Sequence, residues 1–343
     1  MDISADGGRC VLYGGLGSPY SMKVRAVLRY RRIPHDWVQL GTPGAPQDVL
    51  QRVKVPVIPV LRFPDGTWMN DSTPLLHELE RRLPGARSIV PEDPAQAFLA
   101  ALLEDMADEW GTKAMFLYRW LRARDQVQMS EWLAFDRLAG RGRAAIAEHA
   151  ASFRDRQVGR MAMVGCTAHN APLVETSTDR ILRLFEAHVT EAPYLFGSRP
   201  SLADFGWLGQ LSQLIVDPTP AEHLRSFFPW TTRWLMQLDD ASGVEGAWRA
   251  PQTPLPETVR GLLAIAGELY FPFLEANAAA VARGEPTFRI EVWGLPYEQA
   301  PFKYQVRCLA ELRTAYAALP LAARAAVDVA LPAAARESLA RGH

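Results

Sequence analysis

The first ninety residues alternate between strand-like and helix-like hydrophobic patterns. Residues 10–13 form a short apolar run that predicts a strand, and residues 36–40 predict a second one. Between them, apolar side chains recur at helical spacing from Tyr20 until Pro34 ends the pattern. Residues 42–54 are rich in glycine and proline, so we expect them to be irregular.

A hairpin pattern follows this irregular segment. Residues 57–63 and 67–69 have strand-like composition and are joined by turn residues. Ser72 or Thr73 then caps a helix whose leucines share one side. This order of strands and helices requires a mixed sheet with helices packed on it.

From residue 94 onward the pattern changes to long helices. Residues 94–124 are rich in alanine and leucine, and their acidic start suits a helix N-terminus. Further helices are predicted at 130–163, 176–190, 201–215 and 225–240. Ser201 and Asp204 have the spacing of a capping box at the start of one of them.

The C-terminal region follows a linker at residues 239–256 that holds three prolines and two glycines. We expect a helix broken at Pro272 and closing helices from Lys303. Residues 287–292 alternate apolar and charged side chains, which predicts a short strand. A lone strand leaves unpaired backbone groups, so the aromatic stretch 293–304 is its expected hairpin partner.

Length and composition fit a folded chain of two domains with a further segment. Of the 343 residues, 48% are hydrophobic and 22% charged, so the chain can bury a core. The formal net charge of −1 excludes the broad basic surface of a general nucleic-acid binder. No stretch suits a bilayer span, and residues 1–10 lack the apolar core of a signal peptide. We therefore expect a cytoplasmic protein, no membrane or nucleic-acid partner, and domains at 1–88, 89–245 and 246–343.

Neither the cysteines nor the acidic residues indicate a metal site. The cysteines are odd in number and far apart, so they form no disulfide framework or zinc knuckle: Cys10, Cys166 and Cys308. A run of carboxylates has no histidine at ligand spacing: Glu104, Asp105, Asp108 and Glu109. We interpret this run as a solvated or dimer-facing acidic patch, and we expect no metal.

Three short motifs in the first domain carry candidate chemistry. Ser18 lies between a strand and a helix, where its hydroxyl either caps the helix or acts on a bound group. Ile58–Pro59 directly precedes a strand, where proline is tolerated; a cis bond would leave the Ile58 backbone available to an extended peptide. Asp71 and Ser72 stand at a turn into a helix, where they cap it or hold an α-ammonium and an α-carboxylate.

In their order and spacing these motifs resemble those of the glutathione S-transferases over roughly residues 10–240. The matching residues are Tyr13, Ser18, Pro59, Asp65, Gly66, Asp71 and Ser72. The resemblance implies a thioredoxin-like N-terminal domain followed by an all-helical domain, here with an extra C-terminal segment.

The resemblance also implies a site for glutathione as co-substrate. The implied contacts are Lys54, Ile58, Pro59, Asp71 and Ser72, with Ser18 as the catalytic residue. Asp71 and Ser72 would take the γ-glutamyl end, and Lys54 the glycine carboxylate. Tyr13 is the alternative activator of the thiol. Redox-active relatives carry cysteine at the position of Ser18, so we do not expect disulfide exchange by the chain's own thiols.

The acceptor side of the site is open to two interpretations. The candidate pocket residues are Tyr13, Tyr20, Trp110, Tyr297 and Tyr304. The helix from residue 94 adds the apolar side chains Met106, Met115, Phe116 and Trp120, which either face substrate or pack in a core or dimer contact. The C-terminal aromatic stretch likewise either packs as extra core or covers the mouth of the thiol site.

The predicted function is a glutathione-dependent transferase whose thiolate attacks a small apolar electrophile. The alternative is a non-catalytic binding or assembly module with the same fold, which the C-terminal addition keeps open. The resemblance further implies a homodimer, with helices in the range 94–163 supplying most of the contact.

Overall fold

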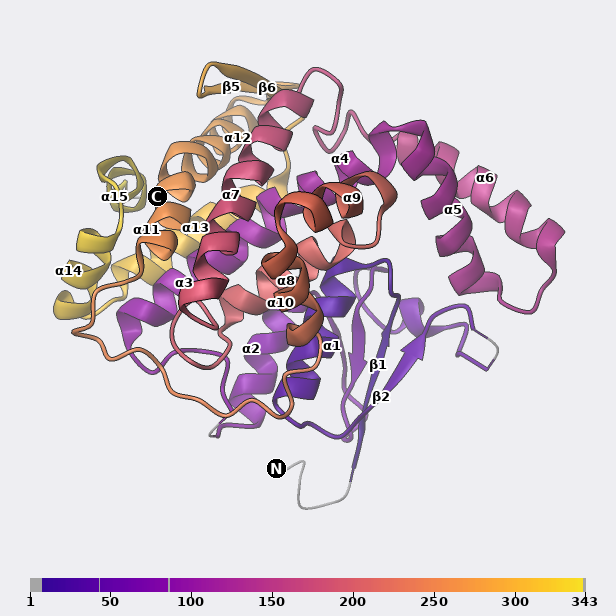
Figure 1. The fold of residues 1–343 in the computed structure, drawn as a ribbon, viewed down its shortest axis with the longest axis horizontal. Helices are drawn as coiled ribbons and strands as arrows, with labels where there is room; N and C mark the ends of the chain where they lie inside the picture. The colour runs from indigo at the N-terminus through magenta and orange to yellow at the C-terminus, as the bar shows by residue number, and fades with distance from the viewer. Residues whose placement is uncertain (1–7, 43, 86, 342–343) are drawn as a thin grey trace.

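The computed structural model describes residues 8–42, 44–85 and 87–341 (Figure 1). The prediction made for residues 1–10 therefore falls largely outside the described residues. Within the described ranges, no helix is long and apolar enough to cross a membrane.

Four short strands form one mixed sheet in the first domain. They are β1 (Cys10–Gly14), β2 (His35–Gln39), β3 (Val60–Arg62) and β4 (Trp68–Asn70). The order is β2–β1–β3–β4, with β1 parallel to β2 and antiparallel to β3, and β3 antiparallel to β4. The predicted mixed sheet is confirmed, although both hairpin strands are shorter than the patterns at 57–63 and 67–69.

Alternation along β1 gives the sheet two buried faces. Two helices accompany the sheet: α1 (Pro19–Tyr30) and α2 (Ser72–Arg82). Leu12 belongs to the large core that these helices share with the rest of the protein. Tyr13 belongs to a separate cluster on the other face, together with Val49. The irregular segment at 42–54 thus covers the second face of the sheet.

The second domain is helical. Its helices are α3 (Pro94–Met106), α4 (Thr112–Leu121), α5 (Ala123–Leu138), α6 (Arg143–Val158), α7 (Ala171–Glu191), α8 (Leu202–Leu214), α9 (Pro218–Phe227) and α10 (Pro229–Leu238). The single helix predicted at 130–163 is wrong, because α5 and α6 are separate helices packed on each other. The chain turns between them at Gly140 and Gly142, whose φ angles of 81° and 93° favour glycine.

A π-helical turn, Ala107–Gly111, joins α3 to α4 within one continuous helical path. Such turns insert one extra residue into an α-helix and are common at functional sites. This turn contains Asp108 and Glu109, two members of the acidic run noted in the sequence.

Helix α8 lies at the centre of the molecule and holds α1 in place. All of its residues are buried, and its predicted capping box is confirmed, since the Ser201 backbone amide donates to Asp204 Oδ2 at 2.8 Å. A Cβ at Gly209 would lie 2.8 Å from the backbone oxygen of Pro19, the first residue of α1. Glycine therefore permits the close approach that fixes the start of α1.

The C-terminal region is helical except for one hairpin. Its elements are α11 (Glu257–Ile265), a π-helical turn (Ala266–Tyr270), α12 (Phe271–Arg283), β5 (Phe288–Val292), β6 (Leu295–Gln299), α13 (Lys303–Ala317), α14 (Leu321–Ala330) and α15 (Ala333–Ala340). Pairing of β5 with β6 confirms the predicted hairpin. The expected break at Pro272 is wrong, because helix runs directly from the π-helical turn into α12.

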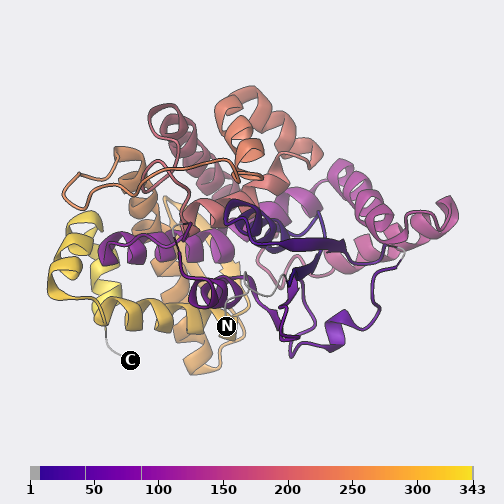
Figure 2. The same ribbon diagram turned by 90° about the horizontal axis from the view of Figure 1, so that it is seen from below.

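Helices α13 and α14 pack on α3, which is buried along most of its length within the chain itself. Figures 1 and 2 show this region and the α5–α6 pair at opposite ends of the molecule, with the sheet domain and α8 between them. Of the predicted dimer-contact range 94–163, α5 and α6 therefore remain the more exposed part.

Candidate functional site

The site begins at the turn between β1 and α1. Ser18 caps α1, and its hydroxyl oxygen accepts a hydrogen bond from the backbone amide of Ser21 at 3.3 Å. The hydroxyl hydrogen is donated to none of the residues that the structure describes. Ser18 is half-buried. The N-cap interpretation is thus confirmed, and the same hydroxyl keeps a hydrogen that it can donate to a bound group.

Two side chains of the helical domain hold this turn. Arg119 of α4 donates through Nη1 to the carbonyl of Gly17 at 2.8 Å, and Gln213 of α8 donates to the carbonyl of Leu16 at 3.2 Å. Arg119 is 2% exposed and also forms bonds of 2.7 and 2.9 Å to the two carboxylate oxygens of Asp217. The turn that carries Ser18 is therefore held by side chains of the helical domain.

Ile58 and Pro59 lie at the entry to β3 and are joined by a cis peptide bond. Among the described residues, none forms a hydrogen bond with the backbone amide of Ile58. The amide is thus free to pair with an extended ligand, as the sequence indicated.

A cleft of about 410 Å³ brings Ser18 and Ile58 together. Its lining includes Gly14, Gly15 and Gly17 of the first domain together with residues of the helical domain. The helical domain contributes the apolar side chains Met115, Phe116, Trp120, Leu133 and Phe153 to the lining. Polar side chains that also line the cleft are Gln39, Arg119, Asp136, Arg137 and Gln157. The cleft is suited to a small molecule with an apolar part.

Asp71 and Ser72 lie at the start of α2. Asp71 has a φ of 70°, a left-handed conformation that costs a non-glycine residue roughly 1–3 kcal/mol and persists where the surroundings hold it. Its side chain does not cap α2, whereas the Ser72 hydroxyl is buried and donates to Asp108 Oδ2 at 3.4 Å. Asp71 is therefore available to other partners.

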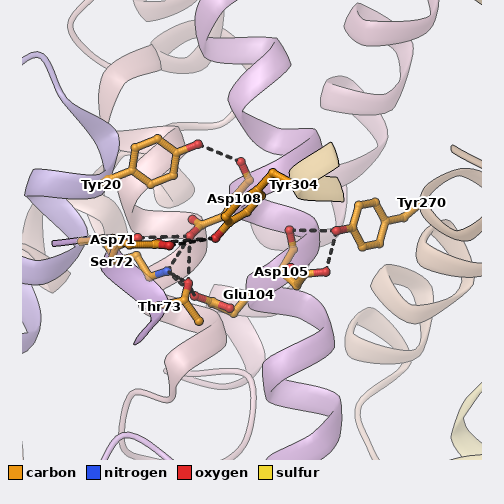
Figure 3. A network of polar contacts seen from close by, with 10 residues as sticks. Tyr20, Asp71, Ser72, Thr73, Glu104, Asp105, Asp108, Tyr270 and Tyr304 are labelled. Atoms are coloured by element: carbon orange, nitrogen blue, oxygen red, sulfur yellow. Dashed lines mark hydrogen bonds and ion pairs between the residues drawn. The ribbon is translucent and has the colours of Figure 1, made fainter. Parts of the chain in front are cut away.

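A buried polar network lies beneath this turn (Figure 3). Lys23 of α1 is fully buried and pairs with Glu104 and, at 2.7 Å, with Asp108. The Thr73 hydroxyl donates to Glu104 Oε1 at 2.6 Å. The interpretation of the acidic run as a solvated or dimer-facing patch is wrong for Glu104 and Asp108, because both lie inside the junction between the two domains.

Burial and charge shift the titration of this network. Burial raises the pKa of Asp108, and Lys23 opposes this effect. For Lys23, burial disfavours the charged form, but Asp108 and Glu104 outweigh it and its pKa is raised. Burial also raises the pKa of Asp71, against the lowering effects of Tyr304 and Arg307. At this end of the site the acidic groups Asp71, Glu104 and Asp108 therefore outnumber the basic groups Lys23 and Arg307.

Three of the predicted pocket residues lie in different surroundings. Tyr13 is buried and stacks on Trp68 with ring centroids 5.4 Å apart, on the sheet face away from α1. Tyr20 lines the cleft, and its hydroxyl donates to the backbone oxygen of Asp108 at 3.0 Å. Trp110 is buried in the core and donates to Ser177 Oγ at 3.0 Å. The cleft lining therefore includes Tyr20 but neither Tyr13 nor Trp110.

The two predicted pocket residues of the C-terminal region, Tyr297 and Tyr304, also lie in different surroundings. Tyr297 is 1% exposed and packs against Trp110 with ring centroids 5.3 Å apart, so it belongs to the core. Tyr304 is 42% exposed and contacts Asp71 instead of the cleft. Lys54 is exposed.

Sequence reasoning missed Arg119 and Lys23 as parts of the site. Their signal is a cation directly flanked by apolar or aromatic residues on a helix, which marks a charge that must be paired if that face is buried. The described residues hold no cluster of three or more His, Cys, Asp or Glu side chains arranged for a metal ion.

The geometry defines a two-domain protein with a thioredoxin-like domain, a helical domain and a cleft between them at a helix N-terminus. Comparison with protein families finds the glutathione S-transferase N-terminal domain at residues 12–87 and the glutathione S-transferase C-terminal domain at residues 143–235. The chain belongs to the glutathione S-transferase family. No curated protein sequence matches it.

Solved glutathione S-transferases are among the similar structures. One from Methylobacterium radiotolerans, in complex with glutathione sulfonate, is 22% identical, covers 72% of this chain and 99% of its own, and has a TM-score of 0.44. One from Methylobacillus flagellatus with bound glutathione is 21% identical, covers 68% and 96%, and has a TM-score of 0.41. A Tau class enzyme from mango is 18% identical, covers 67% and 88%, and has a TM-score of 0.40.

Proposed function

We propose that the protein is a glutathione-dependent transferase in which Ser18 stabilises the glutathione thiolate for attack on a small apolar electrophile. The observation that carries this proposal is the placement of the Ser18 hydroxyl, whose hydrogen no described residue accepts, in a largely apolar cleft beside the Ile58 amide, which no described residue pairs with. Family membership supports glutathione as the thiol.

The strength of one hydrogen bond is sufficient for thiol activation. A hydrogen bond to a charged group contributes about 1.5–3 kcal/mol, and one pKa unit equals about 1.36 kcal/mol. Ser18 can therefore lower a thiol pKa near 8.5 by about one to two units, which raises the thiolate fraction at pH 7 from about 3% to between a quarter and three quarters. The positive end of α1 acts in the same direction.

In the proposed reaction the thiol first loses its proton to solvent. The sulfur then forms a bond to the electrophilic carbon, and the leaving group departs with its electron pair. Asp71 and Ser72 hold the γ-glutamyl end, the Ile58 backbone beside Pro59 pairs with the cysteinyl residue, and Lys54 meets the glycine carboxylate. Met115, Phe116 and Trp120 contact the apolar acceptor, since all three line the cleft.

The homodimer is part of this proposal. Because α3 is covered by the chain's own C-terminal region, we place the contact on α5 and α6. The exposed apolar side chains Val127, Trp132 and Phe135 of α5 are available for it.

Replacement of the hydroxyl tests the role of Ser18. We expect Ser18→Ala to lower turnover with a chlorodinitrobenzene at least tenfold while glutathione affinity stays within threefold, because the hydroxyl acts mainly on the thiolate. Ser18→Thr, which keeps a hydroxyl, is the matched control. Ultraviolet titration of bound glutathione should show its pKa rising by about one unit or more in Ser18→Ala.

Two results would contradict the proposal. Unchanged turnover and thiol pKa in Ser18→Ala would remove Ser18 from the mechanism. Absence of glutathione binding to the wild-type protein at millimolar concentration would favour the non-catalytic module instead.

A further inference from the structure

Helix α13 of the C-terminal region reaches the turn that holds Asp71. Tyr304, in the first turn of α13, donates its hydroxyl to Asp71 at 3.2 Å from Oδ2 and 3.4 Å from Oδ1 (Figure 3). The two residues are 233 positions apart in sequence. A segment outside both family matches thus contacts the residue expected to bind the γ-glutamyl end.

Two neighbours of Tyr304 add polar groups to the same place. Arg307, one turn further along α13, donates through Nε to Glu311 Oε1 at 2.6 Å, and its charge also lowers the pKa of the Asp71 carboxyl against the effect of burial. Gln305 is 6% exposed, faces Glu109, and has a buried side-chain oxygen without a hydrogen-bond partner among the described residues. The first turn of α13 therefore places polar side chains next to the turn that holds Asp71.

The charges at this place match an α-amino acid group. The Asp71 carboxylate suits an ammonium, while the first amides of α2 suit a carboxylate. A carboxylate has about four lone-pair positions, so Asp71 can accept from Tyr304 and from an ammonium at the same time.

Resting on the proposed function, we propose that α13 completes the glutathione site: Tyr304 orients the Asp71 carboxylate toward the γ-glutamyl ammonium. Tyr304 is a positioning residue, because it acts through Asp71. The C-terminal region then serves the glutathione half of the site, and Met115, Phe116 and Trp120 serve the acceptor half.

Calorimetric titration of the full chain with glutathione tests this assignment. We expect Tyr304→Phe to weaken binding about tenfold and raise the glutathione KM by a similar factor, with kcat nearly unchanged, because thiol activation at Ser18 is not altered. Tyr316→Phe is the matched control: Tyr316 also lies on α13, but its hydroxyl donates to Asp328 at 2.6 Å. It should bind glutathione as the wild type does.

Two further measurements separate positioning from a general structural effect. In an Asp71→Asn background, Tyr304→Phe should cause no further loss, since its effect passes through that carboxylate. Cysteinylglycine, which lacks the γ-glutamyl group, should bind the wild type and Tyr304→Phe equally.

The outcomes are distinguishable. Equal or tighter glutathione binding by Tyr304→Phe, or fully additive losses with Asp71→Asn, would overturn the role of α13 and leave the transferase proposal standing. Failure of the wild-type protein to bind glutathione would overturn both.

Discussion

Two buried cations connect the domains at the two ends of the site, and their surroundings differ. Arg119, beside the Ser18 turn, is matched by one carboxylate, Asp217. Lys23, beneath the Asp71 turn, contacts two carboxylates and lies near a third. At the end proposed to hold a thiolate, the Arg119–Asp217 pair is thus balanced in charge, while at the end proposed to hold an ammonium the carboxylates around Lys23 outnumber it. The comparison shows that one interdomain junction can present two electrostatic environments.

The largest effect is expected from Asp217→Asn, which leaves the Arg119 guanidinium buried without a counter-charge. Because a guanidinium does not lose its proton, we expect a loss of about 3–5 kcal/mol in the free energy of unfolding at every pH from 5 to 8. Urea unfolding at several pH values measures it.

The double variant Arg119→Met/Asp217→Leu is the control for this prediction. Replacing both charges with apolar groups should restore most of the lost stability. Turnover should stay low, because methionine cannot donate to the Gly17 carbonyl. A double variant as unstable as Asp217→Asn would show that charge burial is not the cause.

A smaller, pH-dependent effect is expected from Lys23→Met. At pH 8 the variant leaves Glu104 and Asp108 unpaired, and we expect a loss of about 2–4 kcal/mol. Burial already raises the pKa of Asp108, and removal of Lys23 raises it further. As pH falls, the folded state therefore binds protons before the unfolded state does, and part of the loss is recovered by pH 5. Equal losses at pH 5 and pH 8 would contradict the contrast with Arg119.

The smallest effect is a gain in stability from Glu109→Gln. Burial raises the pKa of Glu109 to about 7, from an ordinary value of 4.5, so the folded state loses stability as pH rises from about 4.5 to about 7, and the loss is complete above that range. We expect the variant to be more stable than the wild type by about 1–3 kcal/mol at pH 8 and similar to it at pH 5. Thermal unfolding at the two pH values measures the difference, and no gain at pH 8 would mean that this end carries no excess acid.

Short-range sequence signals predicted much of the fold. The strand at β1, the cap at Ser18 and the hairpin of β5 and β6 depend on residues within a few positions of one another. The single helix predicted at 130–163 failed because glycines at its centre have positive φ, which periodicity alone does not reveal.

Long-range pairing could not be predicted in the same way. Lys23 meets Glu104 across 81 positions, and Arg119 meets Asp217 across 98. Because the sequence does not show that Lys23 pairs with Glu104, the acidic run at residues 104–109 was interpreted as an exposed patch. The contact of Tyr304 with Asp71 joins a segment outside the family pattern to a residue within it, so the resemblance did not indicate it either.

The π-helical turn at 107–111 also changes the direction in which side chains point along the helix that joins the two ends of the site. Each residue of an α-helix advances the direction of its side chains by about 100°, and the extra residue of a π turn offsets everything after it by about that amount. Before the turn, Glu104 faces Lys23; after it, Phe116 faces the cleft. In an uninterrupted α-helix of the same residues, Glu104 and Phe116 could not both keep these directions. The single inserted residue therefore lets one helix serve both the Asp71 end of the site and the apolar side of the cleft.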